Sequence, residues 1–204
     1  FAETKEMVGG FFLLDCATSI AQRGKIEVYN RLGKPLPEGW VIGEDGRPRT
    51  DTAQVLKDLV TGGAALTPLG GIGEDHAGYK GYGYATVVEI LSAALQGGAF
   101  LKALSGIENG KKVPYRLGHF FIAINVEAFT SLDEFKKTAG DILRELRASR
   151  KMPGAERIYT AGEKEYLAWL ERKEKGVPIN ESLQKDMLTL KAELVLTKYH
   201  FPFE

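Results

Sequence analysis

The sequence feature that most constrains the fold is the density of glycine, above all in residues 70–83, which lead into a segment with helical spacing of apolar residues. The chain has 24 glycines in 204 residues, about 12% where roughly 7% is usual. Further glycine pairs stand at positions 9–10, 62–63 and 97–98. Glycine accepts a positive φ and a close approach by a neighbouring backbone. We therefore expect the backbone to turn sharply, or to pass close to another group, at several places.

A glycine loop before a helix is typical of phosphate-binding sites, because backbone N–H groups and the helix dipole favour an anion there. Residues 73–78 have the glycine spacing of a Walker A loop but are not followed by its lysine and hydroxyl residue, and residues 81–86 lack the third glycine of a dinucleotide fingerprint. Lys80 is the candidate here, since glycines flank it and permit a ligand to approach. The alternative is a loop with only a structural role.

The charge balance excludes two classes of partner. The chain has 27 basic and 27 acidic residues, so it lacks the basic surface that binds nucleic acid or an anionic membrane. No apolar run approaches the roughly 20 residues of a membrane-spanning helix. The single cysteine, Cys16, cannot form an internal disulfide, which favours a reducing, cytoplasmic location.

The apolar spacing predicts both strands and helices. A continuous apolar run over residues 10–14 predicts a buried strand that ends at Asp15, and residues 117–126 predict a second strand. Trp40 is expected to anchor an ordered loop over residues 33–52. We expect helices over residues 17–25, 53–60 and 84–96.

The second half of the chain is predicted to be mainly helical. Ser131 and Glu134 have the spacing of a capping box, which begins a helix. Two amphipathic patterns over residues 163–175 and 181–196 predict two more helices, the second with Asn180 as its N-cap. The fold class is therefore α+β with a helical C-terminal extension.

Three further residues have two interpretations each. A carboxylate held at a strand end, as expected for Asp15, can bind a ribose or transfer a proton, but it can equally cap a helix. Cys16 is a nucleophile or a small buried apolar residue. His76 is a proton donor or a solvated loop residue. The histidines lack metal-ligand spacing, so we expect no metal site, and we place His119 at a strand edge.

A basic cluster near the end of the helix that begins at Ser131 has a structural and a functional interpretation. Cations there complement the helix dipole, and they can also attract an anionic substrate or cofactor phosphates. The members of the cluster are Arg144, Arg147, Arg150, Lys151 and Arg157.

Seven segments, in order along the chain, resemble those of one family. They are Phe-Leu-Leu-Asp-Cys-Ala-Thr-Ser at 12–19, Gly-Lys-Ile at 24–26, Pro-Glu-Gly-Trp at 37–40, Gly-Arg-Pro-Arg-Thr-Asp at 46–51, Leu-Thr-Pro-Leu-Gly-Gly at 66–71, Tyr-Lys-Gly-Tyr-Gly at 79–83 and Tyr-Thr-Ala-Gly-Glu at 159–163. The chain thereby resembles the type-2 malate/lactate dehydrogenase family. Its relatives include ureidoglycolate and sulfolactate dehydrogenases and a cyclic imino-acid reductase.

The resemblance implies a homodimer that binds NAD or NADP on a non-Rossmann, mainly antiparallel sheet. The cofactor contacts that it implies fall on Asp15, Cys16, Ala17, Lys80, Gly162, Glu163 and Lys164. The sequence departs from the family pattern at Cys16, where the family has Met, at Tyr79, where many members have His, and at Ala161, where the family has Pro. An extra segment over residues 72–78 separates the glycine pair from Lys80.

The family's catalytic Ser-His-Gly machinery, which lies in an N-terminal half, has no counterpart in this sequence. The chain starts at Phe1 without a signal peptide pattern, and it resembles the C-terminal part of such an enzyme. We expect residues 1–150 to belong to the cofactor-binding domain and residues 151–204 to form a helical extension that packs on the N-terminal part. The catalytic acid is then supplied by that part, and the chain alone is not expected to catalyse.

The reaction implied is hydride transfer between nicotinamide and a small 2-hydroxy or 2-oxo acid, with malate and oxaloacetate as the first pair. Lactate, ureidoglycolate and sulfolactate are the alternatives within the family. A non-catalytic ligand-binding or assembly module, and an unrelated enzyme that uses Cys16 and His76, are the alternatives outside it. The sequence does not distinguish NAD from NADP.

Overall fold

The computed structural model describes residues 12–204. The chain forms two compact units, divided after residues 16 and 122. We call residues 17–122 the middle unit, and residues 12–16 with 123–204 the terminal unit. The division between residues 150 and 151 expected from the sequence, with a cofactor-binding domain before it, stays a prediction.

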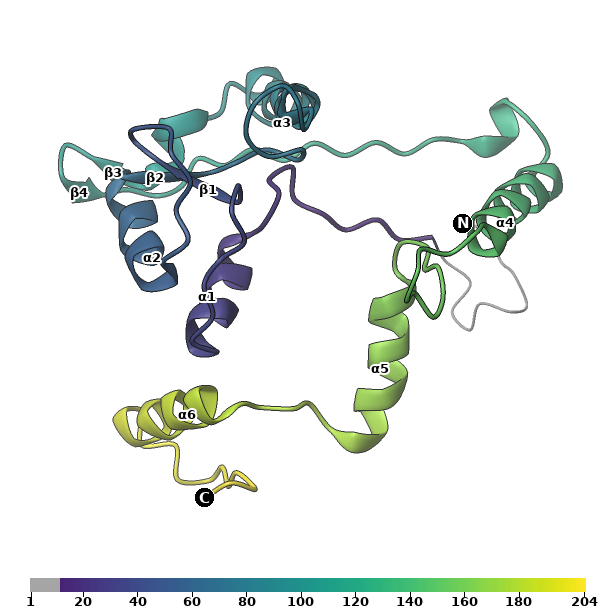
Figure 1. Cartoon of the computed structure of the whole chain (residues 1–204). Helices are drawn as coiled ribbons and strands as arrows, with labels where there is room; N and C mark the ends of the chain where they lie inside the picture. Colours follow the sequence, from purple (N-terminus) through teal and green to yellow (C-terminus); the bar gives the residue numbers. More distant parts are fainter. Residues whose placement is uncertain (1–11) are drawn as a thin grey trace. The chain divides into compact units, whose positions relative to one another are not determined.

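The middle unit contains helices and two small antiparallel sheets (Figure 1). In the first sheet Val41 pairs with Leu66 and Gly43 with Ala64, and in the second Ile107 pairs with Lys112. The elements, in chain order, are α1 (Arg23–Arg31), β1 (Val41–Gly43), α2 (Thr52–Thr61), β2 (Ala64–Leu66), α3 (Gly78–Ser92), η1 (Ala94–Gln96), η2 (Leu101–Ser105), β3 (Ile107–Glu108) and β4 (Lys111–Lys112).

The core of the middle unit lies between α1, α2 and the first sheet. Its buried residues are Ile26, Leu36, Val41 and Val55. Trp40 packs against this cluster and makes an edge contact with Tyr29, with 5.4 Å between ring centroids. This confirms the predicted anchoring of the 33–52 loop.

Helix α2 confirms the prediction for residues 53–60 and extends it by one residue at each end. Asp51 caps it by accepting a hydrogen bond from the Gln54 N–H at 3.0 Å, and Gly62 ends it in the left-handed conformation with φ 86°.

The predicted helix over residues 17–25 is wrong, because α1 begins at Arg23 and includes Gly24. A single glycine costs a helix only about 1 kcal/mol, which the burial of a neighbouring apolar side chain can exceed. Ile26 is completely buried, and its burial places α1 later in the chain than the position of Gly24 had predicted. The preceding residues are instead extended: the Ile20 N–H donates to Thr67 O at 2.9 Å, and the Leu69 N–H donates to Thr18 O at 3.0 Å.

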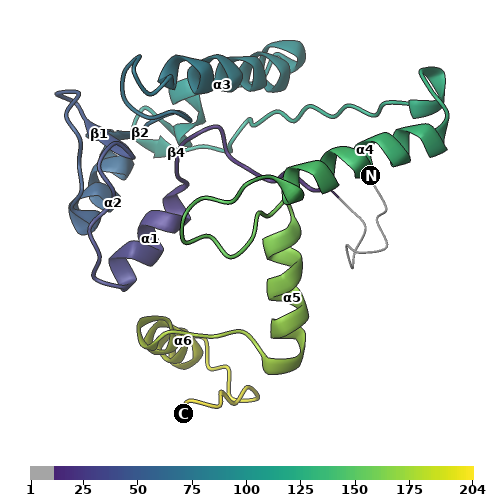
Figure 2. The ribbon, with the colours of Figure 1, turned by 45° about the vertical axis from the view of Figure 1, so that its right-hand side comes forward.

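The terminal unit contains η3 (Val126–Ala128) and the three helices α4 (Leu132–Ala148), α5 (Glu163–Lys175) and α6 (Glu181–Glu193). Figure 2 shows an extended linker between α5 and α6. The capping box is confirmed, since Ser131 Oγ accepts from the Glu134 N–H at 3.3 Å and donates to Glu134 Oε2 at 2.8 Å. Asn180 caps α6 by accepting from the Leu183 N–H at 2.9 Å.

The two strand predictions fail within the described residues. Phe12, Leu13 and Leu14 are exposed and form no strand, and the first two residues of that predicted strand lie outside the described part. Residues 117–125 are extended but have no strand partner. A strand needs a neighbour that pairs with its backbone, and no other described segment provides one here.

The helix predicted over residues 84–96 begins earlier, at Gly78, and its last turn is the separate η1. The glycines of residues 78–83 are therefore helical rather than part of a loop. Over residues 12–204 the fold is helix-rich with small antiparallel sheets, in agreement with the α+β class. None of the helices in this range combines the length and apolarity needed to cross a bilayer.

Candidate functional site

In the terminal unit, the segment that carries Asp15 and Cys16 lies against the turn that precedes α5. The Leu13 N–H donates to Ala161 O at 3.3 Å. Gly162, the N-cap of α5, has φ 87°, and a Cβ atom there would lie 3.1 Å from both Leu13 Cβ and Leu13 O. Glycine is required by its φ and by this close contact. The structure thus brings together two of the three groups of residues predicted to bind the cofactor.

Glu163 holds this turn in shape. Its side chain is buried, and its carboxylate accepts hydrogen bonds from the Thr160 N–H at 3.0 Å and from the Thr160 hydroxyl at 3.3 Å. It also pairs with the Arg157 guanidinium. The Thr160 hydroxyl oxygen in turn accepts from Arg147 Nη1 at 3.4 Å, which ties the turn to the end of α4. The Glu163 carboxylate is thus engaged by the protein itself.

The face of the turn carries positive charge around an aromatic ring. The Arg157 guanidinium carbon lies 4.9 Å and Lys164 Nζ 5.0 Å from the centroid of the Tyr159 ring. Such cation–π contacts hold long side chains near the ring. Lys164 is exposed in the first turn of α5, where the helix dipole adds to the positive potential. This arrangement can attract an anionic group.

In the middle unit, Ala17 and Lys80 lie on segments that share one neighbour, Leu69. The strand-like residues after Ala17 pair with it through the Thr18–Leu69 hydrogen bond. The first turn of α3, which carries Lys80, packs on it so closely that a Cβ atom at Gly81 would lie 2.1 Å from Leu69 O. Both Ala17 and Lys80 are exposed.

The glycines around Lys80 therefore have a different role from the one predicted. A Cβ atom at Gly78 would lie 2.2 Å from Gly71 O, as close to the chain's own backbone as at Gly81. The space beside these glycines is filled by residues 69–73 rather than left for a ligand. Lys80 itself stands 5.8 Å from the centroid of the Tyr79 ring, measured from Nζ.

The other candidates are mostly solvent-exposed. Cys16 is a free, exposed thiol rather than a buried one, and His76 is an exposed loop residue. His119 stacks on Phe121 with 6.2 Å between centroids, and it does not lie at a strand edge because that strand does not form within the described residues. Between residues 12 and 204 no three His, Cys, Asp or Glu side chains gather as metal ligands would.

The basic cluster at the end of α4 is largely engaged in local contacts. Arg144 pairs with Asp141 at 2.5 Å, and Lys151 Nζ donates to Glu156 O at 2.8 Å. A hydrogen bond from Lys137, and then one from Arg144, hold the pKa of Asp141 below the ordinary range. These contacts favour the structural interpretation of the cluster.

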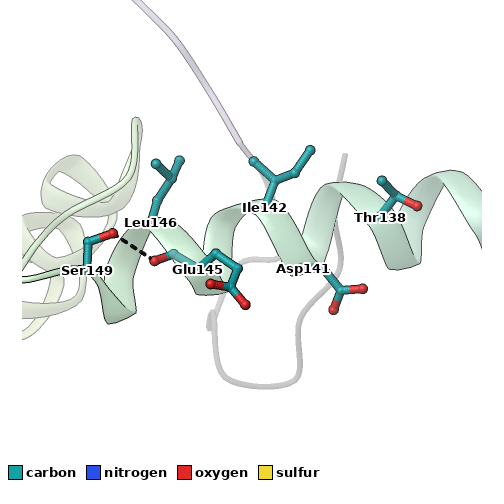
Figure 3. A pocket seen from close by; sticks show the side chains of 6 residues that line it. All are labelled: Thr138, Asp141, Ile142, Glu145, Leu146 and Ser149. Atoms are coloured by element: carbon teal, nitrogen blue, oxygen red, sulfur yellow. Dashed lines mark hydrogen bonds between the residues drawn. The ribbon is translucent and has the colours of Figure 1, made fainter.

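One face of α4 forms an open groove, which Figure 3 shows from close by. The side chains that line it come from α4 and from Ser149, the residue that directly follows it, whose Oγ donates to Glu145 O at 3.0 Å. The lining residues are Thr138, Asp141, Ile142, Glu145, Leu146 and Ser149. Within residues 12–204 no second element lines the groove, so the described residues do not enclose a small ligand there.

Solved structures of two malate dehydrogenases resemble the chain. The structure of malate dehydrogenase from Entamoeba histolytica matches with a TM-score of 0.80 and 40% identity, over 93% of this chain and 51% of that one. Malate dehydrogenase from Pyrococcus horikoshii matches with a TM-score of 0.70 and 32% identity, over 89% and 47%.

The sequence comparisons agree. The chain is 41% identical over 176 residues to the malate dehydrogenase of P. horikoshii and 35% identical over 186 residues to the L-sulfolactate dehydrogenase of Methanocaldococcus jannaschii. It spans about half the length of these relatives, with 86% and 91% of this chain matched to 47% and 49% of theirs. The family model for malate/L-lactate dehydrogenase matches residues 7–188. The chain belongs to the malate/L-lactate dehydrogenase family.

The sequence reasoning missed the residues that support the turn before α5. Thr160 and Glu163 have the three-residue spacing of a capping box, and this signal could have identified the internal role of Glu163. Tyr159 could not have been found this way, because its two cations come from positions with no fixed spacing to it.

Proposed function

We propose that this chain contributes the cofactor-binding part of a dehydrogenase that transfers a hydride between NAD or NADP and a small 2-hydroxy or 2-oxo acid. The observation that carries the proposal is the family match over residues 7–188, together with 41% identity to a malate dehydrogenase. Malate and oxaloacetate are the proposed substrate pair. Relatives named for L-sulfolactate and ureidoglycolate define the alternatives to be tested.

The exposed charged groups of each unit suit parts of a nicotinamide dinucleotide. In the terminal unit, Asp15 is an exposed carboxylate that can accept hydrogen bonds from ribose hydroxyls, and Lys164 is an exposed cation that can contact a phosphate. In the middle unit, Lys80 is an exposed cation that can contact a phosphate. We propose the backbone at Cys16, Ala17 and Gly162 for close approach to the cofactor, which supplies the hydride acceptor or donor when bound.

The role of Glu163 in the proposal is indirect. Its carboxylate bonds to Thr160 and Arg157, so it positions the Gly162 backbone and the Lys164 side chain rather than meeting the cofactor with its own oxygens. The remaining cofactor contacts keep the roles that the family resemblance implies.

We further propose that the cofactor is held on a non-Rossmann, mainly antiparallel sheet, that the enzyme is a cytoplasmic homodimer, and that an N-terminal part of the same enzyme completes it. That part would supply the general acid that handles the proton on the substrate oxygen. Residues 151–204 would pack on it as a helical extension.

The proposal is tested by NADH and NADPH oxidation with oxaloacetate, using the chain together with the N-terminal part and following the reaction in both directions. Turnover with oxaloacetate and little with sulfopyruvate or the imino acid pyrroline-2-carboxylate is the expected result. The proposal would be overturned if NADH fluorescence does not change when NADH is mixed with the protein and none of these acids is turned over.

A matched pair of variants tests Lys80. Lys80→Ala is expected to raise the Kd for NADH at least about tenfold, because a charge-assisted contact to phosphate is worth on the order of 1.5–3 kcal/mol. Lys57 is an exposed lysine on α2 of the same unit, and Lys57→Ala is expected to leave the Kd unchanged. Equal effects of the two substitutions would remove Lys80 from the site.

A further inference from the structure

Helix α6 ends in a turn that places a valine in a conformation suited to glycine. The Leu196 N–H donates to Lys191 O at 2.9 Å, and the Val195 N–H donates to Ala192 O at 3.2 Å, which is the hydrogen-bond pattern of a Schellman motif. Val195 stands at the left-handed position of this motif and has φ 53°. A β-branched residue is rarely found there, because its side chain is crowded against its own backbone. The end of α6 is therefore strained, and surrounding contacts must hold it.

The contacts that can hold this turn come from residues 197–204, which we call the tail and which fold back toward α6 (Figure 1). Lys191 Nζ donates to Glu204 Oε1 at 2.5 Å, and it lies 5.6 Å from the centroid of the Phe201 ring. Glu204 Oε1 also accepts from the Phe201 N–H at 3.1 Å. The Phe201 ring stacks on Phe203 with 5.2 Å between centroids. One carboxylate thus joins the helix and the tail.

The charge of Glu204 controls these contacts. Within residues 12–204, the charged groups that pair with it are Lys191 from α6 and His200 from the tail, whose Nδ1 lies 3.9 Å from Glu204 Oε2. The hydrogen bond from Lys191, and then the one from the Phe201 N–H, hold the pKa of Glu204 below its ordinary value, and a protonated His200 acts in the same direction. The ionised carboxylate therefore stabilises the folded-back tail above the ordinary pKa of a glutamate. This contribution is lost as the pH falls through the lowered pKa.

We propose that the tail is a pH-sensitive latch on the end of α6. In the closed state the ionised Glu204 carboxylate binds Lys191 and the Phe201 N–H, and the tail keeps Val195 in its left-handed conformation. When the carboxylate is protonated the tail leaves α6 and Val195 relaxes. The strain at Val195 favours the open state, so the loss of one charge is enough to open the latch. The family model ends at residue 188, so the latch lies beyond the matched segment, and the inference does not depend on the proposed reaction.

The test is hydrogen exchange of the whole chain, read by mass spectrometry over residues 189–204 and expressed relative to the intrinsic rate at each pH. At pH 7, Glu204→Gln and Lys191→Met are each expected to speed this exchange at least about threefold, because each removes one partner of the ion pair. Lys185→Met changes an exposed lysine on the same helix and should have no effect. Val195→Gly removes the strain and should slow the exchange at least about fivefold.

Lowering the pH from 7 to 3 distinguishes a latch from a permanently fixed tail. The unchanged chain should lose its protection in one step centred below the ordinary pKa of a glutamate, and Glu204→Gln should show no such step. Equal exchange in these two proteins at pH 7, or the same step in both, overturns the latch. Equal effects of Lys185→Met and Lys191→Met also overturn it. So does a loss of protection in peptides of α5 at the same pH, because that result marks general unfolding.

Discussion

Replacing Gly81 by alanine is expected to destabilise the middle unit, whereas the same change at Gly83 is expected to stabilise it. Both glycines lie within α3. A Cβ atom at Gly81 would lie 2.1 Å from Leu69 O and 2.5 Å from Leu69 N, and a backbone cannot rotate away as a flexible side chain can. A Cβ atom at Gly83 meets nothing within 4 Å. The pair separates the effect of helix propensity from the effect of close packing.

The magnitudes follow from these contacts. Alanine is favoured over glycine in a helix interior by up to about 1 kcal/mol, and this gain applies to both positions. At Gly81 the added methyl group costs about 1–3 kcal/mol as overpacking. Moving Leu69 away also strains its hydrogen bond to Thr18 O, which is worth about 1 kcal/mol. We therefore expect the free energy of unfolding to fall by about 1–3 kcal/mol for Gly81→Ala and to rise by up to about 1 kcal/mol for Gly83→Ala.

Urea unfolding followed by tryptophan fluorescence measures both changes. The chain has two tryptophans, and Trp40 packs against the core of the middle unit, so a Trp169→Phe background leaves a reporter for that unit. The shift in the urea midpoint, with the slope m unchanged, gives the change in stability. Equal stabilisation by the two substitutions would refute the packing of the first turn of α3 on Leu69, and with it the structural explanation of the glycines beside Lys80.

Glu163→Gln removes the charge that pairs with Arg157, and we expect the free energy of unfolding of the complete enzyme to fall by about 1–2 kcal/mol. The control is Glu165→Gln, an exposed change on the same helix. Equal urea midpoints for the two variants would contradict the role of Glu163 in the turn. Hydrogen bonds from the hydroxyl groups of Ser131 and then of the preceding residue hold the pKa of Glu134 below its usual range. The ionised carboxylate therefore stabilises α4 above the ordinary pKa of a glutamate, and this contribution is lost as the pH falls through the lowered pKa. Helical circular dichroism measured across this range should show a drop that Ser131→Ala reduces, and identical profiles for the two proteins would argue against the capping box.

Helix boundaries were predicted correctly where a side chain within a few residues determines them. Ser131 and Asn180 begin α4 and α6 because each accepts a hydrogen bond from a backbone N–H three residues further on. The beginning of α1 is different: it depends on Ile26 reaching the core formed by Val41 and Val55, and these residues are distant in sequence. The spacing of apolar residues along the sequence does not indicate that contact, so the predicted helix begins several residues too early.

The candidate site shows the same division between local and distant causes. The glycines around Lys80 were correctly identified as positions of close approach, but the approaching group is the backbone of residues 69–73, and a sequence does not state what fills the space beside a glycine. The family resemblance located the turn at Gly162, yet it did not reveal that the Glu163 carboxylate is occupied by Thr160. Spacing shows that a residue type is required, and only the structure shows which partner requires it.

The failed strand prediction for residues 117–126 has a more specific cause. An apolar pattern reports that side chains become buried, while a strand in addition requires a second backbone at hydrogen-bond distance. The two requirements are met by different parts of a protein: the pattern lies in this segment, and the pairing backbone lies elsewhere in the chain or in another chain. At His119 the amide side chain of Gln96 takes the place of that backbone, and the structure is fixed there. Where the substitute ends, the chain remains extended and its apolar side chains remain exposed, as expected if the pattern is correct and the partner strand lies outside the described residues.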